Sequence, residues 1–432
     1  LAQLAATGCL NRTFYASAKS QLSTVLQLAR EVCVLDSEFV ARTAIYARQS
    51  GHMKDMPALL AAVLAVHDVN LLDRVFNRVI DNGKMLRNFV QIVRSGVTGR
   101  KSLGSRPKKL VQQWLLNASE QQLLGASVGN TPSLADVVKM VHPNPVEPWR
   151  AAWFAWLIGR PYDEATLPPI TQAYERFKRE HSKTQNDQVV AEVPDVPFQM
   201  LSSLDLSAAQ WVQIARKGSW QMVRQNLNTF ARNGVFTHPG GAALVAARLR
   251  DPAAIAKARV LPYQLMAAYT AANATVPAMV REDLQDAMDT ALLNVPQIDG
   301  QVVVCPDVSG SMITAVTGQR GSATSSVRCI DAAALVAAAL LRRNRLARVL
   351  PFEQEVVKLD LNPRDSVMSN AKALAAIGGG GTNCSAPLAL LNHEQAKVDL
   401  VVIVSDNESW VDATRRGATQ TMHEWELLKR RN

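Results

Sequence analysis

Five oxygen-bearing side chains have the types and the spacing to hold a metal ion. Two are carboxylates and three are hydroxyls: Asp307, Ser309, Ser311, Thr382 and Asp406. Hard oxygen donors with few negative charges suit Mg²⁺ or Mn²⁺, which keep part of their water, whereas a calcium site would normally contain more carboxylates. The sequence therefore predicts a site for Mg²⁺, or for another divalent cation such as Mn²⁺.

Parallel strands would bring these five side chains together. Residues 301–305 and 400–404 are short apolar runs, 347–352 resembles another strand, and 329–341 is rich in Ala and Leu like a helix. Strands that alternate with helices form a parallel sheet covered on both faces, and ligands bind beyond the carboxyl ends of its strands. Asp307 and Asp406 each follow an apolar run, and a run of glycines lets Thr382 approach them.

Two other interpretations of the segment around Asp307 remain open. Asp and Ser also cap helices, so the segment could be a plain strand-to-helix turn. Phosphotransferases with an aspartyl nucleophile place Asp after the first parallel strand as well. They normally need a second Asp two residues later, where this chain has Ser309. We therefore expect no catalytic residues and no enzymatic activity.

The first two thirds of the chain show helical periodicity. Apolar residues recur at helical spacing over 71–80 and again over 85–93. Turn-forming pairs such as Asn82-Gly83 and Asp251-Pro252 interrupt the pattern and leave segments of about 10–20 residues, the length of single helices. Such helices, stacked side by side, form an α-solenoid. We predict a mainly α protein with a helical-repeat domain at 1–297 and an α/β domain at 298–432.

Composition and charge indicate a folded protein with a strongly basic first part. The chain has 432 residues, 48% apolar and 19% charged, and a formal net charge of +10. Residues 298–432 carry a net +1, so +9 belongs to residues 1–297. Within that part, 74–109 hold ten basic residues against the single acid Asp81. Most charge runs are solvated helix faces, but this distribution is typical of proteins that bind the phosphates of nucleic acids.

The basic segment supplies most of the candidate RNA contacts: Lys84, Arg87, Arg94, Arg100, Lys101, Arg106, Lys108 and Lys109. Lys139 and His142 are weaker candidates, because a lone histidine before a proline is more often a capping or packing residue. Trp149, Trp153 and Trp156 lie at helical spacing. We expect these tryptophans to pack in the core rather than to stack on bases.

Cysteine usage and hydropathy suggest the compartment. The five cysteines are scattered and form no CxxC pair, which favours a reducing, cytoplasmic environment over a disulfide framework. We see no apolar run of 18 residues or more and no signal-peptide pattern, so we expect no membrane span.

Several sequence motifs resemble those of a known family. The segment 307–311, Gly381-Thr382 and Ser405-Asp406 resemble the metal-ion-dependent adhesion site of a von Willebrand factor A domain. The whole chain resembles the Ro ribonucleoprotein autoantigen family and its bacterial relatives. In this family a ring of HEAT-like helices, the TROVE module, precedes that domain. The phrases 13–17, 258–263, 380–384 and 405–410 carry this resemblance in the right order.

The resemblance implies a function. Family members bind small noncoding Y RNAs on the outside of the ring and take single-stranded ends of misfolded RNAs through its hole. Bacterial members couple through Y RNA to polynucleotide phosphorylase, and the metal is usually completed by a ligand carboxylate. We therefore expect a monomeric, cytoplasmic protein of RNA quality control. The main rival is a metal-dependent protein-adhesion scaffold whose basic charge is incidental.

One departure from the family weakens part of this expectation. Many relatives open the helix before His142 with Gly-Trp-Ser-His, whereas this chain has Thr131-Pro132-Ser133-Leu134. A Y RNA contact through that missing histidine is not carried over to this chain.

Overall fold

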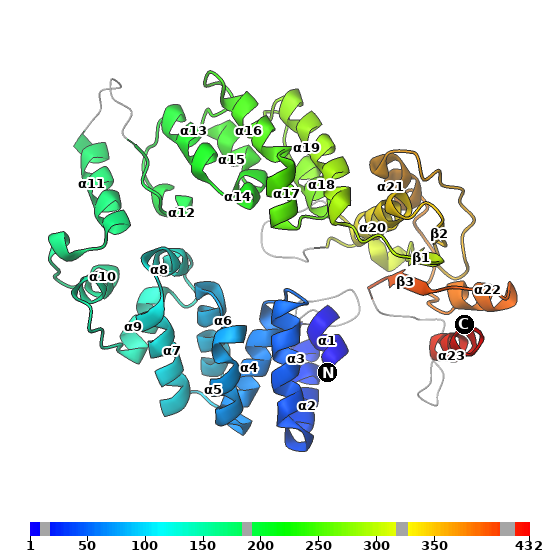
Figure 1. The fold of residues 1–432 in the computed structure, drawn as a ribbon, viewed down its shortest axis with the longest axis horizontal. Helices are drawn as coiled ribbons and strands as arrows, with labels where there is room; N and C mark the ends of the chain where they lie inside the picture. Colours follow the sequence, from blue (N-terminus) through cyan, green and yellow to red (C-terminus); the bar gives the residue numbers. More distant parts are fainter. Residues whose placement is uncertain (9–17, 184–191, 317–326, 407–419) are drawn as a thin grey trace. The chain divides into compact units, whose positions relative to one another are not determined.

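The computed structural model describes residues 1–8, 18–183, 192–316, 327–406 and 420–432 (Figure 1). The chain divides into two compact units. The described residues up to Leu206 belong to the first unit, and those from Ser207 to Asn432 belong to the second.

The first unit is helical throughout its described part. Its helices are α1 (Ala2–Thr7), α2 (Ala18–Leu35), α3 (Ser37–Gln49), α4 (Asp55–His67), α5 (Val69–Val79), α6 (Gly83–Arg94), α7 (Ser105–Asn117), α8 (Glu120–Ser127), α9 (Leu134–Val141), α10 (Pro148–Ile158), the 3₁₀ turn η1 (Glu164–Thr166), α11 (Pro169–Lys183) and α12 (Phe198–Leu201). Neighbouring helices pack on one another along the chain, as α3, α4, α5 and α6 do. This arrangement is that of a solenoid.

Short polar side chains start many of these helices. The Asp68 carboxylate accepts a hydrogen bond from the Leu71 amide, and the Asn82 side chain accepts one from the Met85 amide. Ser119 and Ser133 each form a capping box with the residue three positions later. These caps satisfy amides that have no partner inside the helix, so the sequence fixes the helix starts locally.

The core of the first unit runs along the inner faces of its helices. Residues 56–65 of α4 are all buried, which explains why this helix is apolar on every side. The rings of Phe76 and Phe89 meet edge to face, with centroids 5.3 Å apart. Trp153 is fully buried, and its indole N–H donates to Thr171 Oγ1 at 3.1 Å.

The second unit begins with helices and ends with an α/β part. Its elements are α13 (Ala208–Lys217), α14 (Trp220–Gln225), α15 (Leu227–Arg232), α16 (Gly241–Leu249), α17 (Pro252–Ala258), α18 (Pro262–Ala271), α19 (Ala278–Ala291), η2 (Leu292–Asn294), β1 (Val302–Pro306), η3 (Gly310–Ile313), α20 (Cys329–Arg343), β2 (Arg348–Val349), α21 (Val367–Ala375), α22 (Ala386–His393), β3 (Leu400–Val404) and α23 (Gln420–Arg431).

The described strands form one parallel sheet in the order β2-β1-β3. Val302 pairs with Leu400 and Pro306 with Val404, so β1 and β3 end at the same edge. All five residues of β1 are buried, as expected for a central strand. Leu400 and Ile403 of β3 are partly exposed, because β3 is an edge strand among the described residues.

The mainly α fold with a parallel α/β part is confirmed. The change from helices to strands occurs at β1, close to residue 298. However, the helices from α13 to α19 belong to the same compact unit as the sheet, and α18 packs against α20. The domain boundary at 297/298 therefore stays a prediction. In the part of the chain that the structure describes, no helix is long and apolar enough to cross a membrane.

Candidate metal centre and basic surface

The sheet places Asp307 at the carboxyl end of β1 and holds it on both sides. Its amide donates to Val404 O at 2.9 Å, and the next amide, of Val308, donates to Phe352 O at 2.9 Å. Its carboxylate accepts hydrogen bonds from the Ser309 amide at 2.9 Å and from Ser405 Oγ at 2.7 Å. Asp307 is fully buried, so these two donors and the sheet fix the direction of its oxygens.

Three hydroxyls gather beside this carboxylate. Thr382 Oγ1 donates to Ser309 Oγ at 2.8 Å, and Ser309 Oγ lies 3.2 Å from Ser311 Oγ. All three residues are buried. The Gly310 amide donates to Gly380 O at 3.1 Å, which ties the glycine-rich loop to the turn after β1. Two segments that are some 70 residues apart in the sequence thus deliver one cluster of oxygens.

Asp406 follows β3 at the same edge of the sheet, and both of its carboxylate oxygens are shielded from solvent. Burial, and after it the negative charge of Asp406, raises the pKa of the nearby Cys329 thiol, although a hydrogen bond with Thr314 opposes this shift. All five predicted ligands thus lie at the carboxyl ends of β1 and β3. We call this end of the sheet the metal edge: Asp307, Ser309, Ser311, Thr382 and Asp406.

The chemistry of the metal edge fits a hard divalent cation. It offers two carboxylates and three hydroxyls, and the described residues contain no cluster of three or more His, Cys, Asp or Glu side chains that could hold a metal instead. A cation here would depend on hydroxyl oxygens and water, as Mg²⁺ does when it binds with few charges. The second Asp that an aspartyl phosphotransferase needs is replaced by the Ser309 hydroxyl, which points into the cluster.

Two side chains at this edge were not among the predicted ligands. Ser405, which belongs to the Ser405-Asp406 part of the motif, donates the hydrogen bond that orients Asp307. Glu353 follows the strand beside β1, and its carboxylate occupies the space where a side chain on Gly380 would lie. Gly380 has a φ of +66°. A glycine is therefore needed there both for its backbone conformation and for the space that Glu353 fills.

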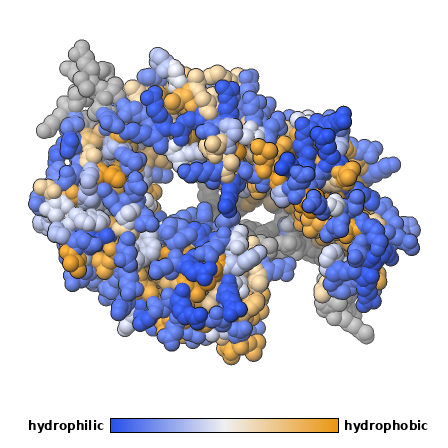
Figure 2. Space-filling model, viewed as in Figure 1, coloured by the Kyte–Doolittle hydropathy of each residue, from blue (hydrophilic) through white to orange (hydrophobic). Residues whose placement is uncertain are grey.

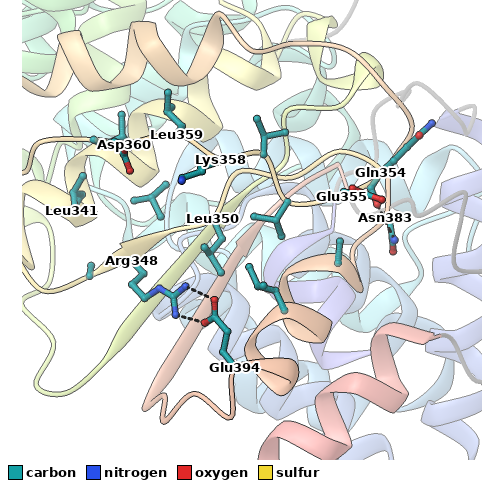
Figure 3. Close-up of a pocket in the computed structure, with 17 residues that line it drawn as sticks. Leu341, Arg348, Leu350, Gln354, Glu355, Lys358, Leu359, Asp360, Asn383 and Glu394 are labelled. Carbon is teal, nitrogen blue, oxygen red and sulfur yellow. Dashed lines mark hydrogen bonds and ion pairs between the residues drawn. The ribbon is translucent and has the colours of Figure 1, made fainter.

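A large cavity lies beside β2, and Asn383, the neighbour of Thr382, forms part of its wall (Figure 3). Its volume is about 1180 Å³, and its walls come from β2, the segment 354–361 and α22. Arg348 and Glu394 form an ion pair at 2.7 Å along one wall. None of the five residues of the metal edge lines this cavity.

Several basic candidates of the first unit converge where α6, α7 and α9 meet. Arg94 Nη1, at the end of α6, lies 3.4 Å from Met140 Sδ of α9. Gln112 of α7 donates to Val141 O at 2.6 Å and to His142 O at 3.2 Å, at the end of α9. These contacts place Lys139 and His142 near Arg94, and Lys108 and Lys109 one helical turn from Gln112.

Three of the predicted contacts have structural roles. The Arg87 guanidinium donates to the carbonyls of Val128 and Pro132, and burial lowers its pKa. Arg100 donates to Ala65 O at 2.8 Å. Arg106 forms an ion pair with Asp73 of α5. These arginines hold helices and loops together, which leaves fewer of their N–H groups for an external phosphate.

The remaining candidates face solvent. Lys84, Arg94, Lys101, Lys109, Lys139 and His142 are exposed, and Lys108 is half-buried. The structure gives none of them an ion pair with an acid among the described residues. We call these seven residues the basic surface: Lys84, Arg94, Lys101, Lys108, Lys109, Lys139 and His142. His142 also ends α9 in a left-handed conformation, with φ of 50°.

The tryptophans pack as expected. Trp153 is fully buried, and Trp149 and Trp156 pack against the same core. The Trp156 N–H donates to Glu175 Oε1 at 2.7 Å. These rings belong to the interior of the first unit.

Comparisons with known proteins agree with the geometry. Residues 301–425 match a family model described as the Ro60 vWA domain. A protein of Deinococcus radiodurans described as "RNA-binding protein RO60" is 25% identical over 436 residues, covering 92% of this chain and 78% of that protein. The solved structure of the Deinococcus radiodurans RO (RSR) protein matches with a TM-score of 0.65 and 19% identity, covering 94% of this chain and 84% of that one. Residues 301–425 thus match a Ro60-type von Willebrand factor A domain, and over most of its length the chain is similar to a bacterial Ro protein in sequence and in fold.

Proposed function

We propose that this protein is a non-enzymatic RNA-binding protein that holds a Y-like noncoding RNA on its basic surface. The observation that carries the proposal is the group of exposed basic side chains on α6, α7 and α9, which have no ion-pair partner among the described residues. Lysines without acidic partners can release the counterions of RNA phosphates, which drives binding. The likeness to a protein described as RNA-binding supports the same function.

The basic surface suits structured RNA. Its charges lie on three helices and a connecting loop, so they spread over a surface rather than line one narrow slot. Double-stranded RNA is recognised mainly through its phosphates and its shape, which such a surface can contact without reading bases. His142 adds a ring nitrogen that can donate to a phosphate.

We further propose that the protein acts in RNA quality control in the cytoplasm. It would bind misfolded or structured RNAs that carry single-stranded 3′ ends, and it would meet polynucleotide phosphorylase through the Y-like RNA. The family resemblance implies a ring of helices with a hole. A narrow positively charged hole admits one strand more easily than a stacked duplex about 20 Å wide. The family resemblance supports this part of the proposal.

The metal edge would bind Mg²⁺ or Mn²⁺ through Asp307, Ser309, Ser311, Thr382 and Asp406. When bound, the cation would supply a positive centre that accepts a carboxylate ligand. The role of the chain is to hold the oxygens: Ser405 and the Ser309 amide orient Asp307, and Gly380 keeps Thr382 close to Ser309.

The test compares one structured RNA in three forms: with a single-stranded 3′ tail of about ten nucleotides, blunt, and with the tail closed into a loop. Binding of all three with preference for the open tail is expected. Equal affinity for the three forms at physiological salt would leave a surface binder of duplex RNA and refute the recognition of ends. No measurable binding of any form would refute the RNA-binding function.

The rival function, a metal-dependent adhesion scaffold, predicts a different result. Such a protein would leave low-salt chromatography without RNA, and its 260 to 280 nm absorbance ratio would be that of protein alone. We expect the ratio to show retained RNA, and we expect it to fall when three lysines of the basic surface are replaced.

A further inference from the structure

The outward face of α3 carries two aromatic side chains that the core does not use. Phe39 is 43% exposed and Tyr46 is 60% exposed. They are seven residues apart, which is two turns, so they lie on the same side of the helix. The exposed Arg42 lies between them. The opposite side of α3 packs into the core through residues such as Val40, Ala44 and Ala47.

A row of arginines on α5 lies next to this aromatic row. Arg74 and Arg78 are exposed and four residues apart, about 6 Å along the helix axis. Arg74 pairs with Glu38 of α3 at 3.5 Å, and Arg78 donates to Gln49 of α3 at 3.0 Å. Because α3 and α5 pack directly against each other, the two rows form one surface. We call it the α3–α5 face: Phe39, Arg42, Tyr46, Arg74 and Arg78.

Exposure of this kind needs an explanation. At the end of α2, shortly before α3 begins, Val34 and Leu35 are also 78% and 85% exposed. Figure 2 shows apolar surface where α2 ends in Figure 1. Contiguous apolar surface bordered by charged side chains marks an interaction site more often than chance exposure does.

The charges of the face favour an anionic partner. Three arginines stand beside two acids: Glu38, whose carboxylate contacts both Arg42 and Arg74, and the exposed Asp36, which caps α3. The neighbouring Asp81 is already held by Arg48 at 2.8 Å. The face therefore keeps a net positive charge, and a phosphate that displaced Glu38 would gain two arginine contacts at once.

We propose that the α3–α5 face binds single-stranded RNA of no fixed sequence. Bases stack on Phe39 and Tyr46, and phosphates contact Arg42, Arg74 and Arg78. Aromatic platforms beside basic rows are the general solution for single strands, because every base has a π-face. A duplex cannot use the aromatics, because its bases are already stacked on one another. This inference rests on the proposed RNA-binding function but uses a different surface from α6, α7 and α9.

Glu38 makes the proposal specific. The carboxylate competes with phosphate for the same two guanidinium groups, so Glu38→Gln should tighten binding of a single strand. A protein-binding face built on Val34, Leu35 and the aromatics would gain nothing from that change. The Phe39→Ala/Tyr46→Ala double variant should weaken binding by about 5- to 100-fold for each stacked base lost.

The experiment measures fluorescence anisotropy of a labelled single-stranded 12-nucleotide oligouridylate and of a blunt RNA hairpin. The full chain is compared with the double aromatic variant, Glu38→Gln, and Tyr162→Ala as a control aromatic that is exposed elsewhere in the first unit. We expect the double variant to lose the oligouridylate and keep the hairpin, Glu38→Gln to bind the oligouridylate more tightly, and Tyr162→Ala to change neither. Tyr46→Phe should retain binding, because the ring remains.

The opposite results are equally clear. Unchanged oligouridylate affinity in the double variant, with an unchanged circular dichroism spectrum, would overturn this inference and leave the basic surface untouched. A change in sedimentation of the RNA-free protein without a change in RNA affinity would assign the face to a protein partner instead. If wild type bound neither RNA, the proposed function itself would fail.

Discussion

The metal edge and the basic surface differ in how their side chains are held. At the metal edge, Asp307 and Ser309 are fully buried and fixed by hydrogen bonds from segments about 75 and 100 residues away. On the basic surface, Lys101 and Lys109 are exposed and have no ion-pair partner among the described residues. We therefore expect a single substitution to disrupt the predicted metal site as a whole. The basic surface is a sum of nearly independent charges, each replaceable in part by its neighbours.

The largest effect is expected from Asp307→Ala. Removing this carboxylate takes away a charged side chain that we propose as a metal ligand, and it leaves the Ser405 hydroxyl and the Ser309 amide without their buried acceptor. We expect titration calorimetry with Mg²⁺ or Mn²⁺ to show no binding. Asp360→Ala, an exposed carboxylate of the same unit, serves as the control and should bind like wild type.

The same variant tests the separation of the two regions. Asp307→Ala should bind RNA almost normally, since all seven residues of the basic surface belong to the first unit. Identical isotherms for wild type and Asp307→Ala would show that the metal edge has been assigned wrongly.

The second effect is graded rather than absolute. Replacing Lys101, Lys108 and Lys109 by Ala removes up to three phosphate contacts, so log affinity should fall less steeply with log salt, by roughly 2 to 3 units of slope. Near physiological salt the affinity should drop on the order of 100-fold. A filter-binding salt series measures both quantities.

Three exposed lysines of the second unit provide the matched control: Lys257, Lys358 and Lys372. Their replacement by Ala changes the net charge equally, so it should alter the slope little. Equal slopes in both triple variants would mean that net charge, rather than this surface, drives binding.

The third effect separates a structural from an open basic side chain within one helix. Arg87→Ala removes donors to the Val128 and Pro132 carbonyls and should lower the free energy of unfolding by about 1–3 kcal/mol. Lys84→Ala, on the exposed side of the same helix, should stay within about 0.5 kcal/mol of wild type. Urea unfolding measures both. A flattened salt slope without lost stability in Arg87→Ala would mean that this guanidinium meets phosphate after all.

The smallest effect concerns a surface ion pair. The hydrogen bond from Arg348 lowers the pKa of the Glu394 carboxyl, so the pair stabilises the fold above the unfolded pKa of about 4.3 and loses this contribution as pH falls through the lower folded pKa. Because Glu394 is well exposed, Glu394→Gln should cost only about 0.2–1 kcal/mol at pH 7. Urea unfolding at pH 7 and near pH 3 should show this difference shrinking in acid. A constant difference would indicate a packing effect instead.

Local rules account for the elements that were predicted correctly. Asn82 and Asp251 were expected at helix boundaries, and each caps the helix that follows it. The run 400–404 forms β3 with those limits, whereas β2 is only Arg348–Val349, and beyond it Phe352 forms a single bridge with Asp307, the residue after β1. Capping and apolar runs act over a few residues, so they can be read along the chain. The length of a strand depends on its partner strand, so it cannot be read from the local sequence.

The sequence by itself determined the chemistry of this protein: the oxygen donors of the metal edge, their place after apolar strands, and the basic excess of the first part. Only the tertiary structure decided which charges are open to a ligand. Arg87 and Lys84 look equivalent in the sequence, yet the half-buried guanidinium donates to carbonyls whereas the ammonium is exposed. The same holds for Phe39 and Tyr46, which are exposed although aromatic residues usually enter cores. The physical reason is that residue type fixes which groups a side chain can bind. Its neighbours in space decide whether other groups of the protein already occupy it.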